Sequence, residues 1–256
     1  MKSTSHKTLL TLGLLAASLL PAAAADPNAD QLLHQMSAKL AAAKTFSFEA
    51  TREIDPELIP GRALPEKAKV TVSVQRPNKI AGRGVSKAGI RRFIADGRTL
   101  TIVDEKKNLY ATVPMRKSID GLVEEVDAKY GFTPPLAEFA LSDPYAEFHR
   151  QAHTVSYAGR ERLSRCWLGC GGVECDRLSL KGKEADAELW ISTTDHLPRK
   201  LVATFHRAGR PQVRIEFHRW NLAAPVTAAD FTFTPPKGAE KIEMMTTAKM
   251  QAARKH

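Results

Sequence analysis

Beyond its first 25 residues, the sequence has no apolar run long enough to cross a membrane as a helix. No cysteine directly follows the apolar stretch at the start of the chain, so a lipid attachment site is lacking there. Only 3 of the 256 residues are cysteines. We therefore expect a protein that neither spans a membrane nor carries a lipid anchor.

The motifs of common catalytic sites are missing as well. There is no nucleophile elbow, no Ser-His-Asp order and no paired-acid motif. Gly82-Arg83-Gly84 is not followed by the helix that a dinucleotide site requires, and neither a C-x-x-C pair nor an H-E-x-x-H motif occurs. We therefore expect a protein that is not an enzyme and that needs no cofactor and no metal.

Clusters of arginine and aromatic residues of the kind that bind nucleic acid are also lacking, although the net charge is +10. Removal of the first 25 residues takes away Lys2 and Lys7 and leaves a net charge of +8. This excess of positive charge keeps a protein soluble, and it also favours anionic membrane surfaces or acidic partners. We expect no nucleic-acid partner.

The first 25 residues have the three parts of a secretory signal peptide. Lys2 and Lys7 are the positive region, Leu9–Leu20 is the apolar region, and Ala22–Ala25 offers small residues for cleavage. Twelve apolar-rich residues are too few for a membrane anchor. We predict cleavage after Ala25, export, and a periplasmic location for the mature protein.

Four alternating segments joined by short turns dominate the second half of the chain. They are Gly172–Leu180, Ala187–Ser192, Arg199–His206 and Gln212–Leu222, and glycine or proline occurs in each of the turns between them. Because successive side chains of a strand point to opposite faces, each segment predicts a strand with one apolar face. Short turns imply antiparallel neighbours.

The second face of these strands is not uniformly polar. By alternation it carries Trp190, Val202 and Trp220. A partly apolar second face indicates that another part of the chain lies against it.

The first half combines strands with helices. Six alternating segments predict strands, and Leu32, Leu33, Met36, Leu40 and Ala43 predict an amphipathic helix over 30–43 that is capped by Asp30 or Asp26. A helical insertion interrupts the strands at about 118–150. It begins with a helix over Ile119–Tyr130, capped by Ser118 and ended by Gly131, and two shorter helices start at Pro134 and at Asp143.

These elements predict a mainly β protein of the α+β class. We expect a curved antiparallel sheet of about 10 or 11 strands, a half-barrel whose concave face is covered by the N-terminal helix and the helical insertion. The domain is expected over residues 26–245, and residues 246–256 are expected to be a basic, flexible tail.

Several motifs in this order resemble those of a family of predicted periplasmic proteins of unknown function, placed in the LolA-like superfamily of lipoprotein carriers and RseB-like sensors. They are Arg76-Pro77, Asp96-Gly97, Ile119–Leu122, Ser142–Ala146, Gly172–Leu178, Glu188–Ile191, Leu197–Val202, Trp220–Leu222 and Phe231–Ala239. The resemblance covers nearly the whole mature chain and implies the half-barrel fold. Function carries over only as an analogy of fold.

The three cysteines lie within ten residues of one another. In an oxidising compartment, Cys166 pairs with Cys170 or with Cys175, and the remaining cysteine is then buried or reactive. Free thiols and a metal site are the alternatives, but the metal lacks a fourth ligand at a suitable spacing. The resemblance implies that Cys175 is the family's usual cysteine and that the other two are additional.

Helices on a curved sheet can leave an apolar cavity between the two layers. The apolar stripe of the insertion, formed by Leu122, Val126, Tyr130, Leu136 and Phe139, is the expected lining. We predict a non-enzymatic periplasmic protein that binds a lipid or a lipoprotein acyl chain there. The alternative is an envelope signalling or interaction module that acts through a protein partner.

Overall fold

The computed structural model describes residues 27–59, 61–132, 134, 136–164 and 171–249. Twelve strands form one sheet in the order β12-β6-β5-β4-β3-β2-β1-β11-β10-β9-β8-β7, and every neighbouring pair is antiparallel except β12 and β6. The strands are β1 Thr45–Ile54, β2 Glu66–Gln75, β3 Lys79–Ser86, β4 Gly89–Ala95, β5 Thr99–Asp104, β6 Leu109–Pro114, β7 Ala152–Ser164, β8 Gly172–Gly182, β9 Ala185–Ser192, β10 Pro198–Phe205, β11 Gln212–Asn221 and β12 Glu240–Lys241.

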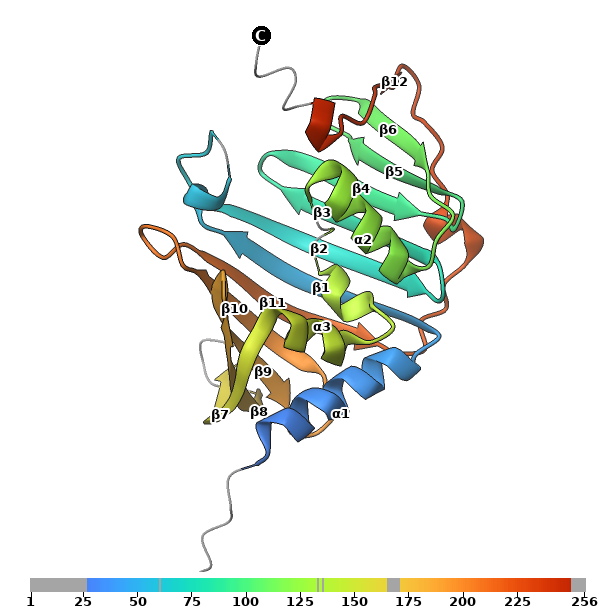
Figure 1. Cartoon of the computed structure of the whole chain (residues 1–256). Helices are drawn as coiled ribbons and strands as arrows, with labels where there is room; N and C mark the ends of the chain where they lie inside the picture. Colours follow the sequence, from blue (N-terminus) through green and yellow to red (C-terminus); the bar gives the residue numbers. More distant parts are fainter. Residues whose placement is uncertain (1–26, 60, 133, 135, 165–170, 250–256) are drawn as a thin grey trace, which may run out of the picture.

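The helices lie together on one face of this sheet (Figure 1). They are α1 Ala29–Ala42, α2 Ile119–Tyr130, η2 Ala137–Ala140 and α3 Pro144–Gln151, while η1 Pro56–Leu58 and η3 Ala228–Phe231 are short turns elsewhere. Because β7, the last strand of the sheet, contacts both α1 and α3, the sheet curves around the helices. The expected curved antiparallel sheet with helices on its concave face is confirmed.

The sheet has twelve strands, so the expected 10 or 11 was too few. β12 consists of only two residues, Glu240 and Lys241, and pairs in parallel with Leu109 and Tyr110 of β6. Two residues are too short to show an alternating pattern, and for that reason the sequence did not reveal this strand.

The ends of the helices follow simple capping rules, with one correction. Ser118 caps α2 by accepting a hydrogen bond from the backbone N–H of Gly121, and Gly131 ends the helix with a φ of 68°. Asp143 caps α3 in the same way. The cap of α1 is Asn28, not Asp30 or Asp26, because its side chain accepts from the N–H of Gln31.

Trp220 lies on the concave face, contrary to the prediction from alternation. The pairing of β1 with β11 shifts between Glu49 and Ala50, where β11 has one extra residue. This β-bulge moves every later residue of β11 to the other face. Trp220 therefore stands opposite Phe48, with ring centroids 4.5 Å apart.

Candidate functional site

An aromatic cluster forms the middle of the concave face. Phe48 and Phe217 project from β1 and β11, and their ring centroids are 5.6 Å apart. Phe139 of η2 stacks edge-on against Phe217 at 4.9 Å and lies 5.7 Å from Phe148 of α3. The ring contacts thus join the sheet directly to the helices that lie on it.

We call residues 118–151, which contain α2, η2 and α3, the cover. Its underside is formed by the stripe that the sequence singled out. Leu122, Val126, Leu136 and Phe139 are each 0–3% exposed and belong to one hydrophobic core with the strands, and Tyr130 is half-buried at its margin. These side chains fill the space between the cover and the sheet, so a ligand can enter there only if the cover moves.

Arg76 fastens the cover to α1 and to the β2–β3 turn. Its guanidinium donates hydrogen bonds to four backbone oxygens at 2.8–3.3 Å, which are those of Leu40 and Ala43 at the end of α1 and of Ala140 and Leu141 at the end of η2. Loss of hydration on burial lowers the pKa of Arg76, and the nearby Asp120 carboxylate opposes this shift. Arg76 therefore binds backbone carbonyls at the ends of two helices, where such oxygens have few intrahelical donors.

The other hydrogen bonds made by the cover lie at its rim. Asp120 of α2 accepts hydrogen bonds from the N–H and the hydroxyl of Ser142 at 2.9 and 2.8 Å. Asp30 of α1 accepts from Tyr145 at 2.9 Å and contacts His149 at 2.8 Å, and the pKa of Asp30 is lowered mainly by the hydrogen bond from Tyr145. Apolar contacts hold the centre of the cover, and hydrogen bonds hold its edge.

A pocket of about 600 Å³ opens between α2 and the rest of the cover, on its outer side. Six of its twelve lining residues are acidic: Asp120, Glu124, Asp127, Glu138, Asp143 and Glu147. Burial and, to a smaller extent, the neighbouring Glu147 carboxylate raise the pKa of Glu138 to about 7. Within the part of the chain that the structure describes, no group of three acidic, histidine or cysteine residues is arranged to hold a metal.

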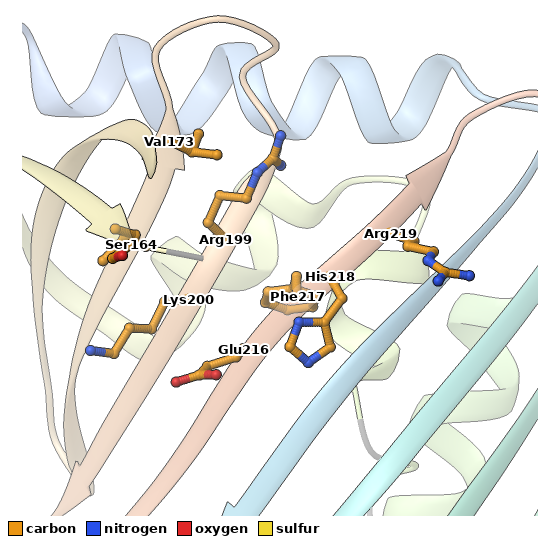
Figure 2. A pocket seen from close by; sticks show the side chains of 9 residues that line it. Ser164, Val173, Arg199, Lys200, Glu216, Phe217, His218 and Arg219 are labelled. Atoms are coloured by element: carbon orange, nitrogen blue, oxygen red, sulfur yellow. The ribbon is translucent and has the colours of Figure 1, made fainter. Parts of the chain in front are cut away.

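The convex face carries a different kind of site, a groove of about 630 Å³ between the β7–β8 hairpin and the β10–β11 pair. Figure 2 shows the side chains of Lys200, Glu216 and His218 on the side of the strands that faces away from the helices. The groove is lined by Leu163, Ser164, Val173, Arg199, Lys200, Glu216, Phe217, His218 and Arg219. Four of these nine residues are charged, three of them positively.

Trp190 lies beside this groove and is nearly buried, with 3% of its surface exposed. Its indole N–H donates to Glu161 at 2.8 Å, and the ammonium of Lys200 lies over its ring at 4.5 Å from the centroid. Side chains of neighbouring strands thus shield this convex-face tryptophan. His218, also on this face, is hydrogen-bonded to Thr51 at 2.7 Å.

Cys175 is a fully buried free thiol on β8. Burial raises its pKa to about 11, so the reactive thiolate is rare at neutral pH. Cys166 and Cys170 lie outside the described residues, and their pairing stays a prediction.

Neither Arg76 nor the convex groove was identified as a site from the sequence. The partners of Arg76 are backbone oxygens that lie 33 to 65 residues away in the chain, and no side-chain motif marks them. The groove depends on how the β7–β8 hairpin lies against β10 and β11. The Arg76-Pro77 pair, part of the family resemblance, was the one available signal.

A family model described as "Predicted periplasmic protein (DUF2092)" matches residues 29–245. Among curated proteins, none matches the sequence. No helix within the described ranges is long and apolar enough to cross a membrane.

Several solved structures are similar in arrangement and distant in sequence. The MucA/MucB complex of Pseudomonas aeruginosa is 15% identical with a TM-score of 0.45, and the match covers 80% of this chain and 61% of that one. A LolA superfamily protein from Nitrosomonas europaea is 10% identical with a TM-score of 0.38, covering 80% and 97%. A DUF1329 family protein from Desulfovibrio piger is 11% identical with a TM-score of 0.37, covering 80% and 95%. The chain thus spans about three fifths of the length of the MucB structure.

Proposed function

The chain belongs to the DUF2092 family of predicted periplasmic proteins, and from this premise we propose that it binds a hydrophobic ligand between the sheet and the cover. The ligand class is a lipid or the acyl chain of a lipoprotein. The protein holds this ligand without chemical change, in the periplasm, and needs no cofactor.

One observation carries the proposal, namely the apolar layer between cover and sheet. Leu122, Val126 and Phe139 belong there to one hydrophobic core with Phe48 and Phe217, and the hydrogen bonds of the cover lie at its rim. An alkyl chain is able to replace such side-chain packing without leaving a buried polar group unpaired. Burial of about ten methylenes contributes about 8 kcal/mol, which offsets the free energy required to lift the cover from the sheet.

The cover is the element that moves in this proposal. Arg76 anchors η2 next to the end of α1, whereas α2 is tied by Asp120 to Ser142 and packs on the sheet mainly through apolar side chains. Displacement of α2 opens the layer beneath Leu122 and Val126 and leaves the Arg76 contacts in place. Loading and release of the ligand then follow from the opening and closing of α2.

The test is lipid extraction from protein purified from the periplasm, followed by mass spectrometry. We expect a lipid in about stoichiometric amount, and after delipidation we expect saturable binding of a fluorescent fatty acid. Val126→Gln places an amide in the apolar layer and is expected to weaken this binding, whereas Glu124→Gln on the outer side of α2 is the matched control. Protein that is free of lipid and that ignores the fatty acid would contradict the proposal.

The convex groove favours a second candidate, an envelope protein partner. Its volume of about 630 Å³ and its mixed charges suit a polar segment of another protein. Crosslinking in envelope extracts tests this candidate. Capture of a single partner that is lost in Lys200→Glu and Arg219→Glu, but not in Val126→Gln, would favour the interaction module over the carrier.

A further inference from the structure

The connection between β1 and β2 projects from one end of the sheet. Ile54 pairs directly with Glu66, so residues 55–65 form an excursion of eleven residues. At the same end, the β3–β4 turn needs only the two residues between Ser86 and Gly89. The β10–β11 hairpin lies next to this loop at the same end of the sheet (Figure 1). Its length exceeds what joining two antiparallel strands requires.

Ordered contacts hold the base of this loop. The Asp55 carboxylate accepts a hydrogen bond from the N–H of Gln212 at 2.8 Å and pairs with Arg214 at 2.9 Å. Within the loop, the backbone N–H of Leu58 donates to the backbone carbonyl of Asp55 at 3.1 Å. The backbone N–H of Arg62 donates to the backbone carbonyl of Ile59, also at 3.1 Å. The base of the loop is therefore held against β11.

Leu64 lies in the projecting part and is 76% exposed, the largest value among the large apolar residues of the described chain. Ala63 and Pro65 beside it are exposed too. A single exposed leucine is ordinary on a protein surface. Leu64 differs from such a residue because positively charged side chains surround it.

Positive side chains surround the loop. Lys67 follows it on β2, Lys87 occupies the β3–β4 turn, and Arg207 and Arg210 occupy the β10–β11 turn, all exposed. Asp55 pairs with Arg214 and Glu66 pairs with Arg52 and Arg62, whereas Glu105 and Glu184 in other turns at this end are exposed. Among the described residues, no ion pair involves Lys67, Lys87 or Arg207, and Glu57 is the unpaired acid of the loop.

We propose that this end of the sheet docks on the surface of an anionic phospholipid bilayer. Leu64 enters the boundary between headgroups and acyl chains, and Lys67, Lys87 and Arg207 contact lipid phosphates. An apolar tip within a positive ring combines the two attractions that hold a peripheral protein on such a surface. The inference concerns an exposed end of the fold and does not depend on a ligand beneath the cover.

The test is flotation of delipidated protein with vesicles of phosphatidylglycerol and phosphatidylcholine, compared with vesicles of phosphatidylcholine alone. Wild-type protein is expected to float with the anionic vesicles and to be released by high salt. Leu64→Asp should weaken binding about tenfold, since it removes the buried side chain. Lys67→Gln with Arg207→Gln should weaken it about twentyfold, since each cation near the surface contributes about fivefold.

Two variants serve as controls. Met245→Asp changes another exposed apolar residue, 46% exposed, and Arg98→Glu changes an exposed cation in the β4–β5 turn at the opposite end of the strands. Both are expected to bind as the wild type does, and far-UV circular dichroism verifies that every variant is folded. The proposal is overturned if the wild type ignores anionic vesicles, if Leu64→Asp binds them unchanged, or if the controls lose as much as the loop variants.

Discussion

The two faces of the sheet are built from alternate residues of the same strands, yet they differ in every contact that matters for binding. On the concave face, Phe48 and Phe217 lie under the cover and are nearly inaccessible to solvent. On the convex face, Lys200, Glu216 and His218 line an open groove. Because strand side chains alternate with a period of two, each strand supplies one face for stability and another for contact with solvent or partners.

The difference between the covered and the open face indicates which of them must change conformation to bind a ligand or a partner. A ligand of the concave face must displace the cover. A cover that packs more stably on the sheet therefore lowers the affinity for the ligand. A partner of the convex groove meets side chains that are already exposed and needs no such rearrangement. Variants of the two faces should therefore separate stability from partner binding.

The largest effect is expected for Phe139→Ala on the concave side. The ring touches Phe148 and Phe217 and is fully buried, so its removal leaves a cavity that costs about 3–5 kcal/mol in the free energy of unfolding. Urea unfolding followed by circular dichroism measures this loss. Glu216→Ala in β11, next to Phe217 but on the convex face, should change stability by less than about 0.5 kcal/mol. If Phe139→Ala and Glu216→Ala lost the same free energy of unfolding, the two faces would not differ in their contribution to stability.

Arg76→Ala comes next. It removes the donor for four backbone oxygens at the ends of α1 and η2, and we expect a loss of about 2–3 kcal/mol in the free energy of unfolding. The rate of uptake of a fluorescent fatty acid should change little, because α2 opens while these contacts stay in place. Arg76→Lys should keep part of this stability. Arg219, whose side chain is 81% exposed next to Glu49, is the matched convex arginine, and its replacement by alanine should cost at most about 0.5 kcal/mol. Much faster uptake in Arg76→Ala would show that Arg76, and not the movement of α2 alone, limits entry of the ligand.

A smaller effect concerns the pH dependence of the cover. Burial raises the pKa of Glu138 from 4.5 to about 7, so the folded protein binds a proton there more tightly than the unfolded chain. The stability of the folded state therefore falls as the pH rises from 4.5 through 7, and the full penalty is present above pH 7. At pH 8, Glu138→Gln should stabilise the protein by about 1–2 kcal/mol, with little gain at pH 4.

Thermal unfolding from pH 4 to pH 8 measures this difference. Glu124→Gln is the control, because Glu124 lines the same acidic pocket but is exposed. A parallel pH dependence of wild type and Glu138→Gln would show that Glu138 is not the group responsible.

The smallest effect on stability is expected for His218→Ala on the convex face. It removes one exposed hydrogen bond to Thr51, which costs about 0.5 kcal/mol or less. If the groove binds an envelope protein, the same variant should weaken crosslinking to that partner. A loss of more than about 2 kcal/mol in urea unfolding would mean that the convex face also holds the fold together.

Much of the fold could be predicted from local pattern. Alternation located ten of the twelve strands, and Ser118 and Gly131 delimited α2 correctly, because alternation and these caps depend on residues close in the sequence. Trp220 was assigned to the wrong face because a bulge depends on the pairing of two strands that are distant in the sequence. The role of Arg76 could not be predicted, since its partners are backbone oxygens whose positions follow only from the packed helices.

For the candidate site, the sequence indicated which residues face the sheet, but not whether they line an open cavity or fill it. Leu122, Val126, Leu136 and Phe139 do form the underside of the cover, and helical periodicity is enough to place Leu122 and Val126 there. Whether an apolar stripe lines a cavity or fills it depends on the distance between cover and sheet. No periodic pattern encodes that distance.

Photo-crosslinking with a fatty acid that carries a diazirine near its methyl end tests the central claim most directly. Delipidated protein is mixed with the probe, irradiated and digested, and the labelled peptides are identified by mass spectrometry. We predict labels on peptides of α2 and η2 and of β1 and β11, all competed by unlabelled fatty acid. Labels confined to peptides of the convex groove, or labelling that unlabelled fatty acid does not reduce, would contradict the claim that the layer beneath the cover opens for a ligand.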